Sequence, residues 1–341
     1  MPRLNQLEDI LFPIEQHPVF VRAKTDKGER RLSVPHKMAI VAKPSWRVLG
    51  IVSRSYRLVH NEEALAMAYE CCRAVFPETK PSEWGVEAAD APATASYCHI
   101  DLSHNSAKLD FRFVPPDDRP ELFGPFIRVT NSYNGQRALA FDVGFHRKVC
   151  KNGLVLPDTI IRFKFAHQHR DIGKTVQFEI AKDKLAGLKT MFTESLAAFR
   201  ALVVRRAQFR PLICGVFGLR PPQPLKPGSR EAEDWATLVS HLDVLVNRYT
   251  DELGENAYAA FNAVTDFASH PPDNRCVHRD RHGLQRLAGL WLSEFNRKCG
   301  GPNFQLADYL QELATPKARA AGPEVSVRGL RQINPPASAT N

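Results

Sequence analysis

Residues 131–155 read NSYNGQRALAFDVGFHRKVCKNGLV, and this stretch decides how the surrounding sequence is interpreted. Two Asn-Gly dipeptides, which suit turn positions that need a positive φ, enclose an alternating segment. Every second residue of that segment is large and apolar: Leu139, Phe141, Val143 and Phe145. A period of two predicts a strand with one buried face. The expected turn residues, whose asparagines can cap a turn with their side chains, are Asn131, Asn134, Gly135, Asn152 and Gly153.

Strand patterns continue on both sides of this segment. They occur at residues 38–42, 46–53, 95–102, 108–114, 127–130, 138–145 and 159–166. We expect 95–102 and 108–114 to pair as a hairpin around a polar turn. One early helix is predicted from residue 61, with two acids in its first turn and Pro77 just past its end.

The pattern changes near residue 183, where apolar residues begin to recur at helical spacing. Helices are predicted at 183–206, 231–249, 254–269, about 280–299 and 304–313. Strands followed by helices predict an α+β fold, with a mainly antiparallel β-sheet region containing a few helices and then a helical region. The expected division is a β-rich domain at 1–182, helices at 183–314 and a disordered basic tail at 315–341.

The composition is that of a globular protein, with 43% hydrophobic and 24% charged residues among 341. No apolar run reaches the 18 residues that a membrane span needs, so we expect no membrane association. The first residues lack the apolar core of a signal peptide, and the seven cysteines are an odd number without a disulfide framework. A cytoplasmic location is therefore expected.

Charge is segregated along the chain, whose net charge is +9. Residues 21–60 carry ten Lys and Arg against two acids, and residues 195–230 carry seven with no acid. Residues 231–274 are acidic, with a net charge of −8. This pattern favours a positive face that attracts polyanions. The alternative is that folding brings the basic segments next to the acidic segment, so that their charges pair and no positive face remains.

The leading functional hypothesis is nucleic-acid binding, with single-stranded DNA as the favoured ligand and a homo-oligomer as an assembly that suits this role. Arginine suits this role because its planar fork donates two parallel hydrogen bonds to a phosphate. The expected contact residues are Arg137, Arg147, Lys148, Lys151, Arg162, Lys164, Arg205, Arg206 and Arg210. Two structural explanations stay open. The first six residues of this list could simply be exposed side chains on turns and strands, and the arginines near 200–220 could pair with the acidic helices that follow them.

A second hypothesis is a metal-assisted phosphodiesterase. Asp266 and His270 are four residues apart on a predicted helix, so the carboxylate could orient the imidazole. Cys276, His278 and His282 follow with residue types that fit zinc but with no standard finger spacing. The same sequence pattern would arise if Asp266 belonged to a buried hydrogen-bond network and His270 lay at the C-terminus of the helix without a catalytic role. No nucleotide-binding, metalloprotease or serine-hydrolase motif is present, and no cofactor is expected. A third hypothesis is a protein-interaction module that uses the acidic helices.

Four segments, in this order, resemble one family. They are YRLVHNEEAL (56–65), TNSYNG (130–135), VCKNGL (149–154) and NAYAAFNAVTD (256–266). The resemblance is to the phage/plasmid-like family that carries domain of unknown function 932, over roughly residues 40–295. It implies a bacterial or mobile-element setting, in which DNA maintenance and recombination are common tasks, but it supplies no activity.

The sequence also departs from the family pattern. Asn134 stands where an aspartate is usual, Gln136 and Arg137 stand where small hydroxyl residues are common, and His278 and His282 are additional. The two additional histidines speak against a metal site shared by the whole family.

Overall fold

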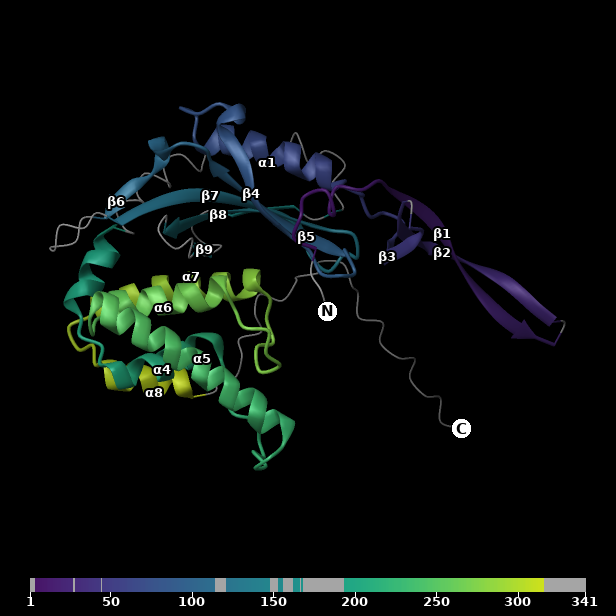
Figure 1. The fold of residues 1–341 in the computed structure, drawn as a ribbon. Helices are drawn as coiled ribbons and strands as arrows, with labels where there is room; N and C mark the ends of the chain where they lie inside the picture. Colours follow the sequence, from purple (N-terminus) through teal and green to yellow (C-terminus); the bar gives the residue numbers. More distant parts are fainter. Residues whose placement is uncertain are drawn as a thin grey trace, which may run out of the picture.

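The computed structural model describes residues 4–26, 28–43, 45–113, 121–147, 153–155, 162–165, 167 and 193–315. A central antiparallel sheet has one helix on one face and a group of helices on the other, and a separate three-stranded sheet projects from one end (Figure 1). The fold is α+β, with sheets first and helices afterwards, as the sequence predicts. Among the described residues, no helix is both long and apolar enough to cross a membrane.

The central sheet has the strand order β10-β8-β7-β5-β4, with β6 on β7 and β9 on β8. Its strands are β4 (Trp84–Asp90), β5 (Tyr97–His104), β6 (Phe111–Phe113), β7 (Glu121–Ser132), β8 (Leu139–Arg147), β9 (Gly153–Val155) and β10 (Arg162–Phe165). The predicted hairpin of 95–102 with 108–114 is wrong. A 3₁₀ turn at Ala107–Leu109 redirects the chain, so that β6 pairs with β7 while β5 lies between β4 and β7.

The apolar side of the central sheet packs against α1 (Asn61–Val75). Alternate residues of β7 and β8, such as Ile127, Val129, Phe141 and Val143, are fully buried there. This is the face that the period of two predicts for β8. The side chains at the intervening positions point to the opposite side of the sheet, where the C-terminal helices lie.

The helical layer covers that opposite side (Figure 1). After a helical stretch at residues 193–201 it consists of α4 (Arg206–Phe217), α5 (Arg230–Leu253), α6 (Ala257–Ser269), α7 (Arg281–Cys299) and α8 (Leu306–Ala314). The last four are close to the predicted ranges. Helix α4 was not predicted, because Pro211 lies inside it and its arginines favoured a charge-based interpretation. Ser229, Asn256 and Asp280 cap α5, α6 and α7 with their side chains.

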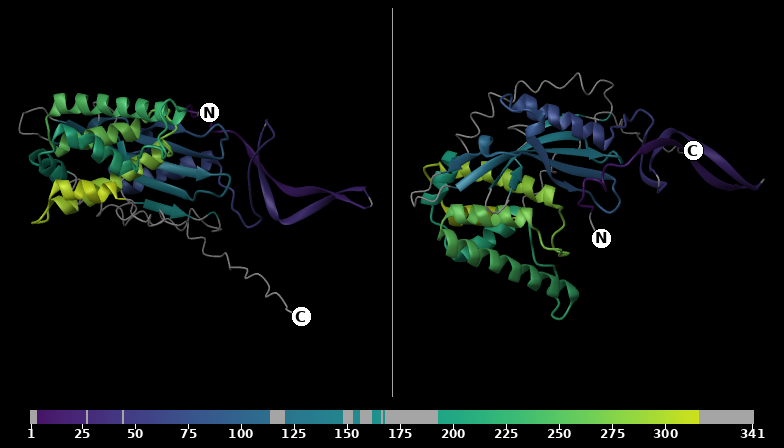
Figure 2. Two further views of the ribbon diagram at one scale, coloured as in Figure 1. Left: turned by 90° about the horizontal axis from the view of Figure 1, so that it is seen from below. Right: turned by 45° about the horizontal axis from the view of Figure 1, so that its top comes forward.

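The projecting sheet consists of β1 (Ile14–Thr25), β2 (Gly28–Ala42) and β3 (Arg47–Ser53), in that order. Its base has a small core of its own, in which Ile40, Leu49 and Val52 pack with Tyr133 of the central sheet region. Beyond the base, β1 and β2 continue as a two-stranded ribbon that points away from the helices (Figures 1 and 2). We call residues Phe20–Ser33 the outer arm.

Candidate functional site

Three arginines predicted to contact nucleic acid lie on α4 or at its start, close to carboxylates of the acidic helix α5 and of the residues just after it. Arg205 lies 3.4 Å from Glu255, Arg206 pairs with Asp251, and Arg210 lies 3.1 Å from Asp243. This is the arrangement of the alternative hypothesis, in which the basic and acidic segments pair with each other. All three arginine side chains are about half exposed or more, and exposed ion pairs contribute only about 0–1 kcal/mol each.

The other predicted contacts divide into two groups. Arg147 is buried and donates to Asn262 of α6 (3.3 Å), and Arg137 donates to Asp280 (2.9 Å) while its guanidinium lies over the ring of Tyr97. Both therefore join the sheet to the helical layer. Lys148, Lys151 and Asn152 lie outside the described residues, and only the backbone is described for Arg162, Lys164 and Gly153.

The asparagines of the first turn have different roles. Asn134 accepts hydrogen bonds from Ser132 (2.9 Å) and from the backbone of Gln136 (3.0 Å), and Gly135 has a φ of 72°. These two residues lie in the connection between β7 and β8, at residues 133–138. Asn131 instead lies inside β7, is buried, and donates to Asn61 at the start of α1 (2.8 Å).

A row of alternating charges crosses the helix-facing side of the central sheet. Asp101 of β5 lies opposite Arg128 of β7, which lies opposite Asp142 of β8, and Arg162 of β10 has the next register position. Directly opposed residues share a face, so β5, β7 and β8 place acid, base and acid in one line. The pairing partners lie 14 to 27 residues apart in sequence, which is why no local motif predicts this row.

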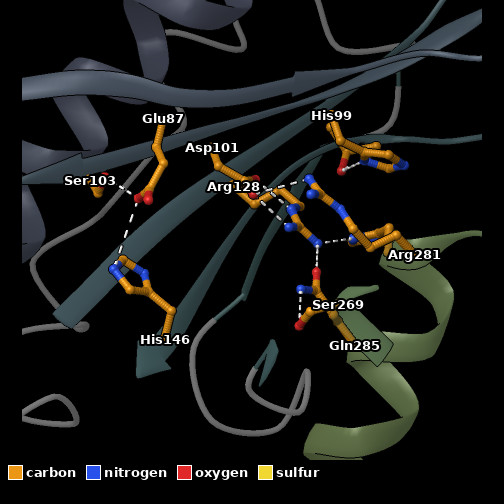
Figure 3. A network of polar contacts seen from close by, with 11 residues as sticks. Glu87, His99, Asp101, Ser103, Arg128, His146, Ser269, Arg281 and Gln285 are labelled. Carbon is orange, nitrogen blue, oxygen red and sulfur yellow. Dashed lines mark hydrogen bonds and ion pairs between the residues drawn. The ribbon is translucent and has the colours of Figure 1, made fainter. Parts of the chain in front are cut away.

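Arg128 is the centre of this row and is 1% exposed. It donates to Asp101 through Nε (2.5 Å) and Nη2 (2.6 Å), and its Nη1 donates to Gln285 of α7 (2.6 Å) (Figure 3). Burial by itself would lower the pKa of Arg128, but the nearby carboxylates, first that of Asp101, outweigh it and the pKa is raised. The guanidinium is therefore a permanent charge in the layer between sheet and helices.

His282, a candidate metal ligand from the sequence, also belongs to this layer. Its Nδ1 accepts from Nη1 of Arg128 (3.1 Å), and its ring stacks on His99 of β5 at a centroid distance of 4.1 Å. Burial, followed by the influence of His99 and Arg128, holds the pKa of His282 well below its ordinary value. The His282 imidazole is therefore neutral and accepts a hydrogen bond from Arg128, so its burial does not place a second positive charge beside the guanidinium.

Asp266 and His270 are hydrogen-bonded, as their spacing suggests, with 2.9 Å between Oδ1 and Nδ1. Asp266 also accepts from Tyr249 (2.7 Å) and Arg248 (3.2 Å) of α5, so this carboxylate joins two helices. His270 is the C-cap residue that follows α6 and is exposed. Within the described part of the chain, which includes His270, Cys276, His278 and His282, no three His, Cys, Asp or Glu side chains are placed to share a metal ion.

A small polar pocket of about 290 Å³ lies near the β4 edge of the central sheet. A register shift in β4 between Val86 and Ala88 places Glu87 there, where it accepts from Ser103 (2.5 Å) and lies 3.9 Å from His146 (Figure 3). Bulges often aim a side chain in this way. Sequence reasoning did not single out Glu87, because a bulge leaves no local signal.

The outer arm was also missed as a structural element, although its charge was noted. Cross-strand pairing places Phe20, Arg22, Lys24, Glu29 and Arg31 on one face of the ribbon, with Arg22 directly opposite Arg31 and Lys24 directly opposite Glu29. All five side chains are exposed, and the Arg31 guanidinium lies 3.7 Å from the centroid of the Phe20 ring. Arg22, Lys24 and Arg31 make no ion pair with any residue that the structure describes.

Comparison with known proteins places these features in one family. A family model described as "Domain of unknown function (DUF932)" matches residues 104–291, from the end of β5 into α7. Neither the curated proteins nor the solved structures gave a match. The matched residues include Arg128, its helix-side partners and the β7–β8 turn, while the arm and α1 lie before them. More than half of the chain is matched, and the chain therefore belongs to the DUF932 family.

Proposed function

We propose that this chain is a nucleic-acid-binding protein that favours single-stranded DNA and contacts it with the basic face of the outer arm. The observation that carries the proposal is the pair Arg22 and Arg31, opposed across two strands without an acidic partner among the described residues. Like charges directly opposite each other destabilise a strand pair. A phosphate between them would remove that repulsion, so the arm gains stability on binding a polyanion.

Phe20 supports single-stranded over double-stranded DNA. Its side chain is 41% exposed on the same face as the three cations. Unpaired bases stack on exposed aromatic rings, and each stack contributes about 1–3 kcal/mol. Trp46, at the base of the arm, is 63% exposed and has the Lys43 ammonium 5.6 Å from its ring centroid. Because Lys43 also pairs with Glu15, a DNA strand that follows the arm would find the Trp46 ring, and not a free cation, at this second position.

The arm is a better candidate than the arginines that the sequence singled out. Arg205, Arg206 and Arg210 already have carboxylate partners on the chain, so a phosphate would have to compete with those partners. Arg137 and Arg147 hold the helical layer to the sheet. Among the described residues, the candidate ligands of the metal-assisted enzyme do not form a group of three that could share a metal ion. The family resemblance supports a cytoplasmic role in phage or plasmid DNA maintenance or recombination.

The test is fluorescence anisotropy with a labelled 30-nucleotide single strand, its duplex and the matching RNA, at salt concentrations of about 50 and 200 mM. We expect tightest binding to single-stranded DNA and a steep loss of affinity at the higher salt, because phosphate neutralisation releases counterions. Preference for the duplex or for RNA would correct the substrate. Absence of binding at the lower salt would overturn the proposal.

A further inference from the structure

One buried carboxylate holds two exposed side chains where α5 and α6 pack together. Asp266 of α6 is only 8% exposed and accepts from His270 through Oδ1. Its Oδ2 accepts from Arg248 and from Tyr249 of α5. The side chains of His270 and Arg248 are 59% and 56% exposed. Asp266 therefore fixes an imidazole and a guanidinium at the surface, where a reactant from solution can reach both.

The carboxylate also determines which nitrogen of the His270 ring carries the proton. An ionised carboxylate can only accept, so Nδ1, 2.9 Å from Oδ1 of Asp266, is the donor. The lone pair of the neutral ring is then on Nε2, the nitrogen that does not face Asp266. His17 has the opposite arrangement, because Glu15 contacts its Nε2 at 3.2 Å. His270 thus presents a nucleophilic nitrogen to the solvent.

Arg248 adds a cation to the same cluster. Its Nη1 lies 3.2 Å from Oδ2 of Asp266, on the carboxylate group that also holds His270. A guanidinium has further N–H donors besides this one, and its planar fork suits phosphate oxygens. The cluster therefore combines a nucleophile, a carboxylate that orients it and a cation for an anionic reactant. Histidine in such surroundings can form covalent bonds to a transferred group.

We propose that His270 is a phosphorylation site, at which Nε2 takes a phosphoryl group from a small acyl phosphate. The lone pair of Nε2 attacks phosphorus and forms a P–N bond, while the P–O bond to the acyl group breaks and the acyl group leaves as a carboxylate. The Nδ1 proton stays between the ring and Asp266, which stabilises the positive charge that the ring acquires. Arg248 stabilises the charge on the phosphoryl oxygens. An acyl phosphate suits an exposed site because its carboxylate leaves readily.

The test treats the whole chain with acetyl phosphate in the absence of nucleic acid, so its outcome does not depend on the proposed DNA binding. Peptide mass mapping in alkali, which preserves phosphohistidine, locates the phosphoryl group, and phosphorus NMR distinguishes Nε2 from Nδ1. His36 of β2 is the internal control, because it is also exposed but has no carboxylate partner among the described residues. We expect phosphorylation of His270 on Nε2 at least about tenfold faster than phosphorylation of His36.

Substitutions separate the roles of the two neighbours of His270. Asp266→Asn should lower the maximal rate of His270 phosphorylation at least about tenfold, because an amide stabilises the charged ring less than a carboxylate does. Arg248→Gln should mainly raise the acetyl phosphate concentration that gives half of the maximal rate, and Arg248→Lys should restore part of this loss. Circular dichroism checks that each variant is folded. Since Arg248 is exposed, its variants test the cluster even where Asp266→Asn unfolds the chain.

Three results would overturn the proposal. The first is an equal rate at His270 and His36, or no phosphorylation of His270. The second is phosphorylation of His270 on Nδ1, the nitrogen that faces Asp266. The third is a folded variant, Asp266→Asn or Arg248→Gln, in which both the maximal rate and the half-saturating concentration match those of the wild type.

Discussion

Arg128 of β7 holds Asp101 of β5 through two parallel hydrogen bonds of 2.5 and 2.6 Å, and its third donor group reaches Gln285 and His282 of α7. One buried guanidinium thus joins two strands to the helical layer. The pair is desolvated, and a buried charge is tolerated only when its partners satisfy it. Arg281 adds a further contact, 3.7 Å from Asp101. The relative position of sheet and helices depends on this cluster.

Replacing Arg128 with methionine should lower the free energy of unfolding by about 3–5 kcal/mol, because Asp101 keeps its charge in a buried site without its main partner. Urea denaturation followed by circular dichroism measures the effect. Arg206→Met is the control, since its exposed pair with Asp251 contributes at most about 1 kcal/mol. Adding Asp101→Leu to Arg128→Met should recover much of the loss. Equal effects of the two single substitutions would contradict this role for Arg128.

Stability should fall as the pH drops below about 6.5, the ordinary pKa of histidine in an unfolded chain. In the folded chain burial and then His99 and Arg128 lower the pKa of His282, so the unfolded chain binds the proton first. The stabilisation is complete above that pH and is lost below it, by at most about 1.4 kcal/mol per pH unit for one proton. Urea denaturation at pH 7.5 and 5.5 measures this difference.

His282→Gln should reduce the pH dependence without abolishing it. Burial also lowers the pKa of His167 and His241, so both contribute in the same direction. A glutamine can still accept a hydrogen bond from Arg128. If the variant shows the same change in stability between the two pH values as the wild type, His282 is not a source of the pH dependence.

The arm base depends on the absence of a side chain at Gly50. A Cβ there would lie 2.4 Å from Cα of Asn134 and 2.7 Å from the carbonyl of Tyr133, both backbone atoms of the β7–β8 turn region. Gly50→Ala should therefore destabilise the chain by roughly 1–3 kcal/mol, as overpacking does. The control is Gly300→Ala, where the closest atom would be 3.8 Å away and φ is −74°. Thermal unfolding should separate the two variants, and a neutral Gly50→Ala would contradict the close contact.

Phe20→Ala should weaken binding to single-stranded DNA by about 1–3 kcal/mol, the contribution of one base stack. Binding to duplex should change less, since paired bases do not stack on the ring. Val21 is the matched control, because it is the next residue and is exposed on the opposite face of the ribbon. Anisotropy titrations of Phe20→Ala and Val21→Ala should differ. Equal losses would show that the face with Phe20 is not the binding face.

Much of the fold follows from periodicity. The alternation at 138–145 predicts β8 and its buried face, and helical spacing predicts α5 to α8, because each of these elements has a core side that the sequence marks. The outer arm has no core side. Both of its faces are exposed, so its strands do not show the alternation of apolar and polar residues that marks a half-buried strand. The sequence therefore does not predict β1. The position of β6 depends on a turn that is visible only in three dimensions.

The candidate sites divide in a similar way. The contact between Asp266 and His270 follows from helical spacing, because four residues make one turn. The partners of Arg128 come from another strand and from α7, and no local pattern brings those segments together. Charge content correctly indicated basic segments, but only the fold shows that the arginines of α4 have carboxylate partners on α5.

The most direct test of the central claim compares two double charge reversals in the anisotropy assay with single-stranded DNA. One is Arg22→Glu with Arg31→Glu on the outer arm. The other is Lys226→Glu with Arg279→Glu, two exposed cations elsewhere that undergo the same charge change. We predict that the arm variant loses at least about tenfold in affinity. The slope of the logarithm of its binding constant against the logarithm of the salt concentration should become shallower by about 0.7 for each lost phosphate contact. The control should stay near the wild type. Equal affinities of the two folded variants would contradict nucleic-acid binding by the arm.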